Sequence, residues 1–123
     1  MMHIFFSARE QVEKANGNGE TALMWAAVNG HHNLAQCLLE KGANVDAVNL
    51  SGETALMWAA ESGQLTVARL LLEHGARANA ADRQGNTVLN LARINGQDDV
   101  VRLLIENGQL SEGDIRVVAL FLL

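Results

Sequence analysis

The sequence predicts an all-α fold, a solenoid of stacked helix pairs joined by hairpin loops. Three observations lead to this prediction. The chain repeats itself at a regular period, every copy carries the same start and stop residues for two helices, and apolar residues recur at helical spacing. Neither helix of a copy is long enough to be stable alone in water. Each copy must therefore bury its apolar face against its neighbours.

Three copies of the repeat align without gaps. Residues 16–48 and 49–81 are identical at 18 of 33 positions, and residues 82–114 share 12 positions with the middle copy. We expect three repeats, at residues 16–48, 49–81 and 82–110. The remaining residues divide into an N-terminal segment, 1–15, and an apolar C-terminal segment, 111–123.

Two helices are predicted in each copy. A threonine begins the first, since its hydroxyl accepts from the free N–H groups of a first helical turn. These threonines are Thr21, Thr54 and Thr87. The first helix, predicted at 22–29 and 55–62 in the first two copies, ends at a glycine that can adopt the left-handed conformation. These glycines are Gly30, Gly63 and Gly96. The second helix is predicted from about residues 33, 66 and 99 to Gly42, Gly75 and Gly108.

Both ends of the chain depart from the repeat. A shift by one repeat length places Ile4-Phe5-Phe6 on Cys37-Leu38-Leu39, which predicts that residues 1–15 form a capping helix and loop. Residues 111–114, Ser-Glu-Gly-Asp, resemble a capping box. The apolar run at 115–123 fits a terminal helix, and a β-strand fits its composition nearly as well.

These motifs resemble the ankyrin repeat family. Thr21-Ala-Leu-Met-Trp-Ala-Ala27 and the later Leu38-Leu-Glu-Lys-Gly-Ala43 are similar to the family's Gly-x-Thr-Pro-Leu-His-x-Ala-Ala and Leu-Leu-x-x-Gly-Ala segments. The resemblance covers about residues 16–108 and implies a protein-binding module. The sequence departs from the pattern at two positions. Ala22, Ala55 and Val88 replace the family's proline, and Met24, Met57 and Asn90 replace its histidine.

Composition and charge exclude several classes of protein. The net charge of −5 and the pI near 5.2 argue against a nucleic-acid partner, which would require clustered Lys and Arg. The longest apolar run, 117–123, is far shorter than the roughly 20 residues of a membrane-spanning helix. The first six residues are too short and too weakly basic for a signal peptide. A single cysteine suits a reducing compartment, so we expect a cytoplasmic protein.

The sequence contains no residue set that predicts catalysis, a cofactor or a metal site. His31 and His32 are adjacent on a helix and would point about 100° apart, so both cannot ligate one ion with Cys37. Cys37 aligns with Leu70 and Leu103 and is therefore expected in the core. Three carboxylates recur at equivalent, solvated positions, whereas catalytic pairs need unlike environments. They are Glu40, Glu73 and Glu106. We do not expect an enzyme.

The tryptophans Trp25 and Trp58 allow two interpretations. They could form a binding stripe, because tryptophan is enriched in interface hot spots. They also occupy a first-helix position where the third copy has Leu91. This apolar position favours packing between copies.

The surface positions that vary between copies are the candidates for binding. They lie just before the predicted N-caps and at the ends of the first helices, and the resemblance implies that they line the concave surface where partners dock. The candidates are Asn18, Glu20, Val28, Asn29, Val48, Leu50, Ser51, Glu53, Glu61, Ser62, Arg83, Gln84, Asn86, Ile94 and Asn95. Acidic residues outnumber basic ones toward the N-terminal side of this set, so we expect a partner that presents Lys or Arg there.

Two functions follow from this interpretation. The first is an adaptor or scaffold that binds another protein through these positions. The second is a structural or regulatory homo-oligomer, or a fragment of a longer array, that makes its contacts through apolar ends. For the second we expect a homodimer through residues of the apolar C-terminal segment. Those residues are Val117, Leu120, Phe121 and Leu123.

Overall fold

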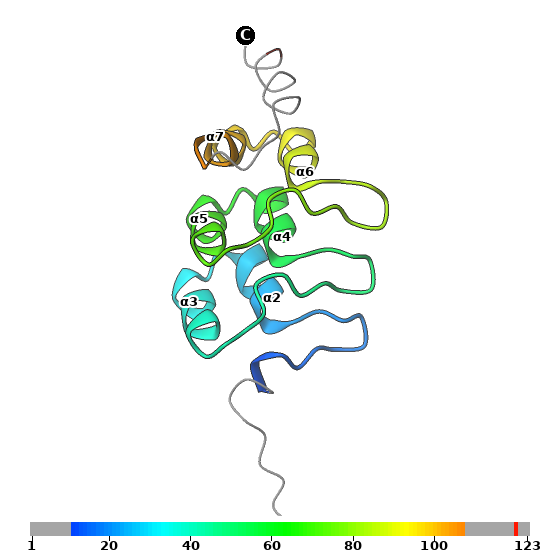
Figure 1. Ribbon diagram of the computed structural model, residues 1–123, viewed down its shortest axis with the longest axis vertical. Helices are drawn as coiled ribbons and strands as arrows, with labels where there is room; N and C mark the ends of the chain where they lie inside the picture. Colours follow the sequence, from blue (N-terminus) through cyan, green and yellow to red (C-terminus); the bar gives the residue numbers. More distant parts are fainter. Residues whose placement is uncertain (1–10, 108–119, 121–123) are drawn as a thin grey trace, which may run out of the picture.

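The computed structural model describes residues 11–107 and Leu120. Along the described part of the chain, six helices follow one another in three pairs (Figure 1). They are α2 (Ala22–Asn29), α3 (His32–Glu40), α4 (Ala55–Ser62), α5 (Leu65–Glu73), α6 (Val88–Ile94) and α7 (Asp98–Glu106). Within the same residues there is no strand, only the isolated bridges Ala15–Thr21 and Ala81–Thr87. The predicted all-α architecture is confirmed.

The helices form two columns. The first helices α2, α4 and α6 pack on one another in order, and the second helices α3, α5 and α7 form the other column (Figure 1). The loops that precede the first helices all project to the same side of the stack. Each of these six helices thus contacts its own pair partner and the equivalent helix of a neighbouring repeat, which is the arrangement of a solenoid.

The first helices begin and end at the predicted residues in the first two repeats. The hydroxyl of Thr21 accepts from Met24 N at 3.4 Å, and that of Thr54 accepts from Met57 N at 3.2 Å. Gly30, with φ of 71°, ends α2 in the left-handed conformation that an L side chain would strain. In the third repeat Asn95 is the C-cap, so α6 ends one residue before the predicted end.

The second helices begin one residue earlier than predicted. After Gly30, the N–H of His31 donates to Ala26 O at 2.9 Å and that of His32 donates to Gly30 O at 2.9 Å. This tight reversal leaves a single residue, His31, between the glycine and the start of α3. The same turn precedes α5 and α7, where the single residues are Gln64 and Gln97.

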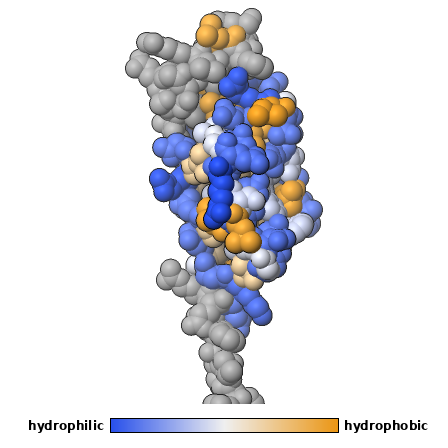
Figure 2. Space-filling model, turned by 90° about the vertical axis from the view of Figure 1, so that its right-hand side faces the viewer, coloured by the Kyte–Doolittle hydropathy of each residue, from blue (hydrophilic) through white to orange (hydrophobic). Residues whose placement is uncertain are grey.

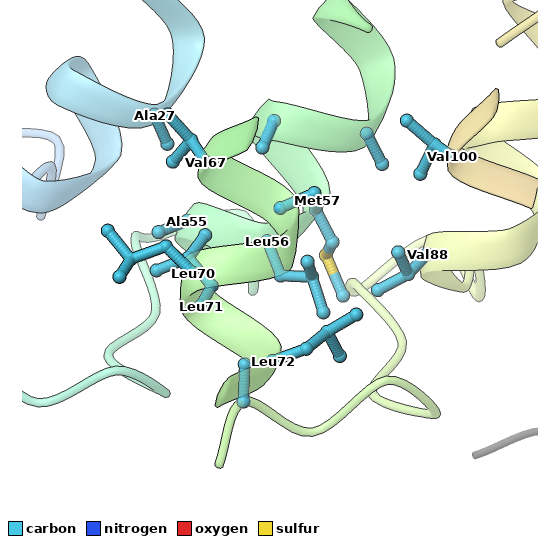
Figure 3. Packing of buried hydrophobic residues seen from close by; sticks show 14 of the residues in the cluster. Ala27, Ala55, Leu56, Met57, Val67, Leu70, Leu71, Leu72, Val88 and Val100 are labelled. Atoms are coloured by element: carbon cyan, nitrogen blue, oxygen red, sulfur yellow. The ribbon is translucent and has the colours of Figure 1, made fainter. Parts of the chain in front are cut away.

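A continuous apolar core runs between the two columns. Figure 3 shows side chains of α4 and α5 in one cluster with Ala27 of the preceding repeat and Val88 and Val100 of the following one. Met57, which replaces the family's histidine, is fully buried in this cluster. Alanines pack closely beside the larger side chains, which explains how a chain with 4% aromatic residues fills its core.

A side-chain carboxylate on the loop after α3 links repeat 1 to repeat 2. Asp46 Oδ1 accepts from the N–H of Arg77 at 3.0 Å, so the end of repeat 1 is tied to the end of repeat 2. Glu13, which stands one repeat length before Asp46, accepts in the same way from the N–H of Asn44. Residues just before repeat 1 therefore make the contact that a preceding repeat would make. Residues 1–10 of the expected capping segment lie outside the described residues.

Candidate protein-binding surface

The hairpin before each first helix is organised by the side chain at its first position. Asn49 Oδ1 accepts from the backbone N–H groups of Ser51 and Glu53 at 3.0 and 2.9 Å. Asn49 Nδ2 also donates to Glu53 Oε1 at 2.9 Å. Asn16 makes the same three contacts in the first hairpin. Local side-chain bonds of this kind hold a turn without help from a sheet.

In the third hairpin the amide and the carboxylate change places, so that the carboxylate is at the first position. Asp82 Oδ1 accepts from the N–H groups of Gln84 and Asn86 at 2.9 Å each, and Asn86 Nδ2 donates to Asp82 Oδ2 at 3.2 Å. Burial raises the pKa of Asp82, but hydrogen bonds from Asn86, Gln84 and Gly85 outweigh this effect and hold the pKa below its usual value. Each hairpin thus pairs one carboxylate with one amide.

These contacts add a structural role to three of the predicted binding residues. Glu20, Glu53 and Asn86 each bond to the first residue of their hairpin. The sequence does carry a signal for this role. Residues four apart read Asn–Glu, Asn–Glu and Asp–Asn in the three copies, always one carboxylate and one amide. That regularity fits side chains that bond to each other.

Backbone hydrogen bonds join neighbouring hairpins at their tips. The N–H of Leu50 donates to Asn18 O at 3.0 Å, and the N–H of Arg83 donates to Ser51 O at 3.0 Å. All four residues were predicted as binding residues from their variation. Since the main chains are tied together, the side chains at these positions project from a fixed support.

The ends of the first helices are tied to the next repeat as well. Gln64 Nε2 donates to Val28 O, and Gln97 Nε2 donates to Glu61 O, both at 3.2 Å. Each glutamine lies over the glycine that ends the helix. A Cβ added to Gly30 would stand 2.5 Å from Gln64 Oε1. These glycines are required for this close approach as well as for their conformation.

We call the surface formed by the fifteen predicted residues together with Trp25 and Trp58 the hairpin face. All seventeen residues are exposed or half-buried. The most exposed apolar side chains of this face are Val48, Leu50 and Ile94, at 57%, 60% and 74%. Figure 2, seen from the side on which the hairpins project, shows apolar patches interrupting a mainly hydrophilic surface. The structure thus places all predicted binding residues where a partner can reach them.

The two tryptophans pack on each other across the first two repeats. Their rings are T-shaped, with centroids 5.4 Å apart and an interplanar angle of 89°. Trp58 is half-buried against the core, whereas Trp25 remains 49% exposed. The predicted packing between copies is confirmed. However, Trp25 is also a surface residue, because about half of its side chain is exposed.

The hairpin carboxylates act on the charge of Glu61, which lies near the C-terminal end of α4. Burial raises the pKa of Glu61, and the charges of Glu53 and Asp82 raise it further. The charges of these three side chains therefore interact across the hairpin face. An exposed arginine, Arg83, follows Asp82 at the adjacent hairpin tip.

A shallow depression of about 240 Å³ lies between the second and third hairpins. It is lined by Leu50, Ser51, Glu53, Asp82, Arg83 and Gln84. Sites for drug-sized molecules usually enclose more space and are mainly apolar. The depression is better suited to single side chains of a protein partner.

Cys37 contradicts the prediction that it belongs to the core. The thiol is exposed, whereas the equivalent Leu70 and Leu103 are buried. Helices α5 and α7 each pack on the second helix of the preceding repeat, and the segment that would precede α3 in this way lies outside the residues that the structure describes. Within residues 11–107 and Leu120, no three His, Cys, Asp or Glu side chains are grouped to hold a metal ion.

Two further predictions concern the C-terminal segment and membrane spans. Val117, Phe121 and Leu123 of the expected self-association segment lie outside the described residues, as does the helix-or-strand alternative for 111–123 apart from Leu120. Leu120 is 80% exposed. No helix in the described ranges is long and apolar enough to cross a membrane.

Comparison with protein families identifies the class to which this stack of helix pairs belongs. The family model described as ankyrin repeats (3 copies) matches residues 2–82 and 46–116. The chain therefore belongs to the ankyrin repeat family. The match extends beyond residues 16–108, where the motifs are clearest, into both end segments. Ankyrin repeats are generally protein–protein interaction modules and are not catalytic. No curated protein matches the chain.

Proposed function

We propose that this chain is an adaptor or scaffold that binds another protein through the hairpin face. The exposed apolar side chains carry the proposal. Six large apolar residues are exposed among those that the structure describes. Four of them, Trp25, Val48, Leu50 and Ile94, belong to the hairpin face, and the other two are Leu34 and Leu120. Apolar surface that gathers on one face usually marks an interaction site.

The hydrogen bonds of the scaffold support the same proposal. Hairpin tips are tied by backbone bonds, and the first helices are tied by Gln64 and Gln97. A surface held in this way loses little entropy when a partner docks, so more of the contact energy remains as affinity. We expect the module to act in the cytoplasm, where the exposed thiol of Cys37 would stay reduced.

Site-specific crosslinking can test the binding face. We call the second helices α3, α5 and α7 the outer helices. A photoreactive amino acid is placed at Leu50 or at Ile94, with Glu73 on the outer helix α5 as the control position. The proposal predicts that one protein crosslinks from both face positions and not from position 73. The combined change Leu50→Ala and Ile94→Ala should then weaken the binding of that protein by about 2 kcal/mol or more. The matched change Leu34→Ala, which removes an exposed leucine outside the face, should leave the affinity unchanged.

Crosslinks from position 73 alone would contradict the proposal. So would a partner whose affinity is unchanged in the Leu50/Ile94 double variant. In that case the outer helices would carry binding.

A second candidate function is self-association through the C-terminal segment. The 80% exposure of Leu120 favours it, because an exposed leucine in an apolar run can pack against a second copy. Sedimentation over a concentration series measures dimerisation directly. A strict monomer at about 100 μM would exclude a micromolar dimer, and a dimer lost on Phe121→Asp would locate the interface at this segment.

A further inference from the structure

One position of the first helices places a carboxylate between two apolar side chains. Val28, Glu61 and Ile94 align with one another in the three repeats and occupy the same place near the ends of α2, α4 and α6. Val28 and Glu61 are half-buried, and Ile94 is exposed. The order along the stack is therefore apolar, acidic, apolar.

The tryptophan pair forms a second row beside this one. Trp25 and Trp58 each lie three residues before the first two members of the row, and side chains at that spacing share one side of a helix. Their rings are in edge-to-face contact, and the half-exposed ring of Trp25 leaves aromatic surface open. The face of a tryptophan ring attracts both apolar groups and cations.

The charge on this side favours a cationic guest. Glu61 is half-buried, and the negative charges of Glu53 and Asp82 act on it, so its ionised form is less favourable than that of an isolated glutamate. Glu53 and Asp82 already bond to amides of their own hairpins. A positive group placed at Glu61 would remove the repulsion between these carboxylates and gain a charge-assisted hydrogen bond.

On the basis of the proposed function, we propose that the partner presents a lysine or arginine between apolar side chains, with the cation at Glu61. The flanking apolar side chains would cover the Trp25–Trp58 pair on one side and Ile94 on the other. An acidic or purely polar segment would leave Glu61 without a counter-charge and the exposed apolar groups without cover. The pattern thus selects a protein segment that is both basic and apolar.

Peptide display on the intact chain tests this assignment. The probe is a library of randomised peptides long enough to cross the first helices of all three repeats, selected against the full-length protein. We expect the recovered peptides to share a Lys or Arg flanked by apolar residues. Affinity for these peptides should fall about ten- to a hundredfold in Glu61→Gln, the range expected for a hydrogen bond to a charged group. Glu61→Lys should abolish binding, because it replaces attraction by repulsion.

Glu73→Gln provides the matched control, since it makes the same change on the outer helix α5. It should leave the affinity unchanged. Thermal unfolding of each variant verifies that the fold is retained.

The outcomes separate this inference from the proposed function. Peptides that bind Glu61→Gln as well as the wild type but fail on the Leu50/Ile94 double variant would overturn the cation site and leave the hairpin face as the binding surface. Peptides insensitive to all of these changes would overturn both. A library that yields no binder contradicts the inference, and so does a recovered motif without a basic residue. Recovery of a motif matching residues 115–123, where Arg116 stands between apolar residues, would make the occupant a second copy instead of a separate partner.

Discussion

Helices α3 and α5 occupy equivalent places in consecutive repeats, yet the same positions are exposed in one and buried in the other. Leu34 of α3 is 47% exposed, whereas its equivalent in α5, Val67, is 1% exposed. Cys37 is exposed, whereas its equivalent Leu70 is buried. The two helices differ in what is described before them: α5 packs on α3, whereas the segment one repeat length before α3 lies outside the described residues. Burial in this protein is therefore a property of the junction between repeats.

The largest expected effect on the free energy of unfolding comes from truncating Leu70 of α5, compared with truncating its equivalent in α3, Cys37. Leu70→Ala removes a side chain that is 6% exposed, and it should lower the free energy of unfolding by about 2–5 kcal/mol. Cys37→Ala changes an exposed side chain and should stay within about 0.5 kcal/mol. Urea denaturation of both variants measures the contrast. Equal losses would show that α3 has a neighbour that buries Cys37.

A second prediction compares a glycine inside the stack with one at its end. Gly63 and Gly96 both have φ of 70°, so alanine strains both, at a cost of about 1 kcal/mol. At Gly63 the added Cβ would also stand 2.3 Å from Gln97 Oε1, while no described atom lies within 4 Å at Gly96. Gly63→Ala should therefore cost about 1 kcal/mol more, because Gln97 must give up its hydrogen bond to Glu61 O.

Thermal unfolding of the two alanine variants provides the measurement. Adding Gln97→Ala to each variant provides the control. The excess cost at Gly63 should then disappear, and an excess that persisted would place the obstacle elsewhere.

The smallest effects should appear in the pH dependence of stability at the junction of repeats 2 and 3. Burial and the nearby carboxylates raise the pKa of Glu61, so its ionised form destabilises the fold, and stability from this group increases as pH falls through the folded pKa. Glu61→Gln should therefore be slightly more stable than the wild type at neutral pH. This gain should vanish below the pKa of an unfolded glutamate.

The pKa of Asp82 is lowered, so its contribution to stability changes with pH in the opposite direction to that of Glu61. Its contribution is present above the pKa of an unfolded aspartate and is lost as pH falls through the folded pKa. Asp82→Asn should be less stable than the wild type at neutral pH, by less than about 1 kcal/mol because the group is near solvent. The double change Asp82→Asn with Asn86→Glu recreates the Asn–Glu pair of the second hairpin and should restore stability. Denaturation at a series of pH values tests both residues, and parallel pH profiles for Glu61→Gln and Asp82→Asn would contradict the assignment.

The repeat architecture could be predicted because it depends on local signals. A threonine that caps a helix and a glycine that ends it act within a few residues, so the bounds of α2 and α4 agree with the prediction. The exposure of Cys37 and Trp25 could not be predicted in this way. An alignment of copies assumes that equivalent positions have equivalent neighbours, and this assumption fails at the end of a stack.

The candidate surface was predictable in position and only partly in role. Variation between copies selected residues that are all accessible, including the apolar Leu50 and Ile94. It could not reveal that Glu53 bonds to Asn49 within the hairpin or that Glu61 interacts with carboxylates of two hairpins. Those effects arise from the distances between side chains after the repeats have stacked.

Hydrogen exchange with and without the crosslinked partner tests the central claim most directly. If the hairpin face binds the partner, amide exchange should slow in the hairpins at 49–54 and 82–87 and in the first helices α4 and α6. The outer helices α5 and α7 should change little, because they lie on the side of the stack opposite to the hairpins. Protection confined to the outer helices, with the hairpins exchanging as fast as in the free protein, would contradict this account.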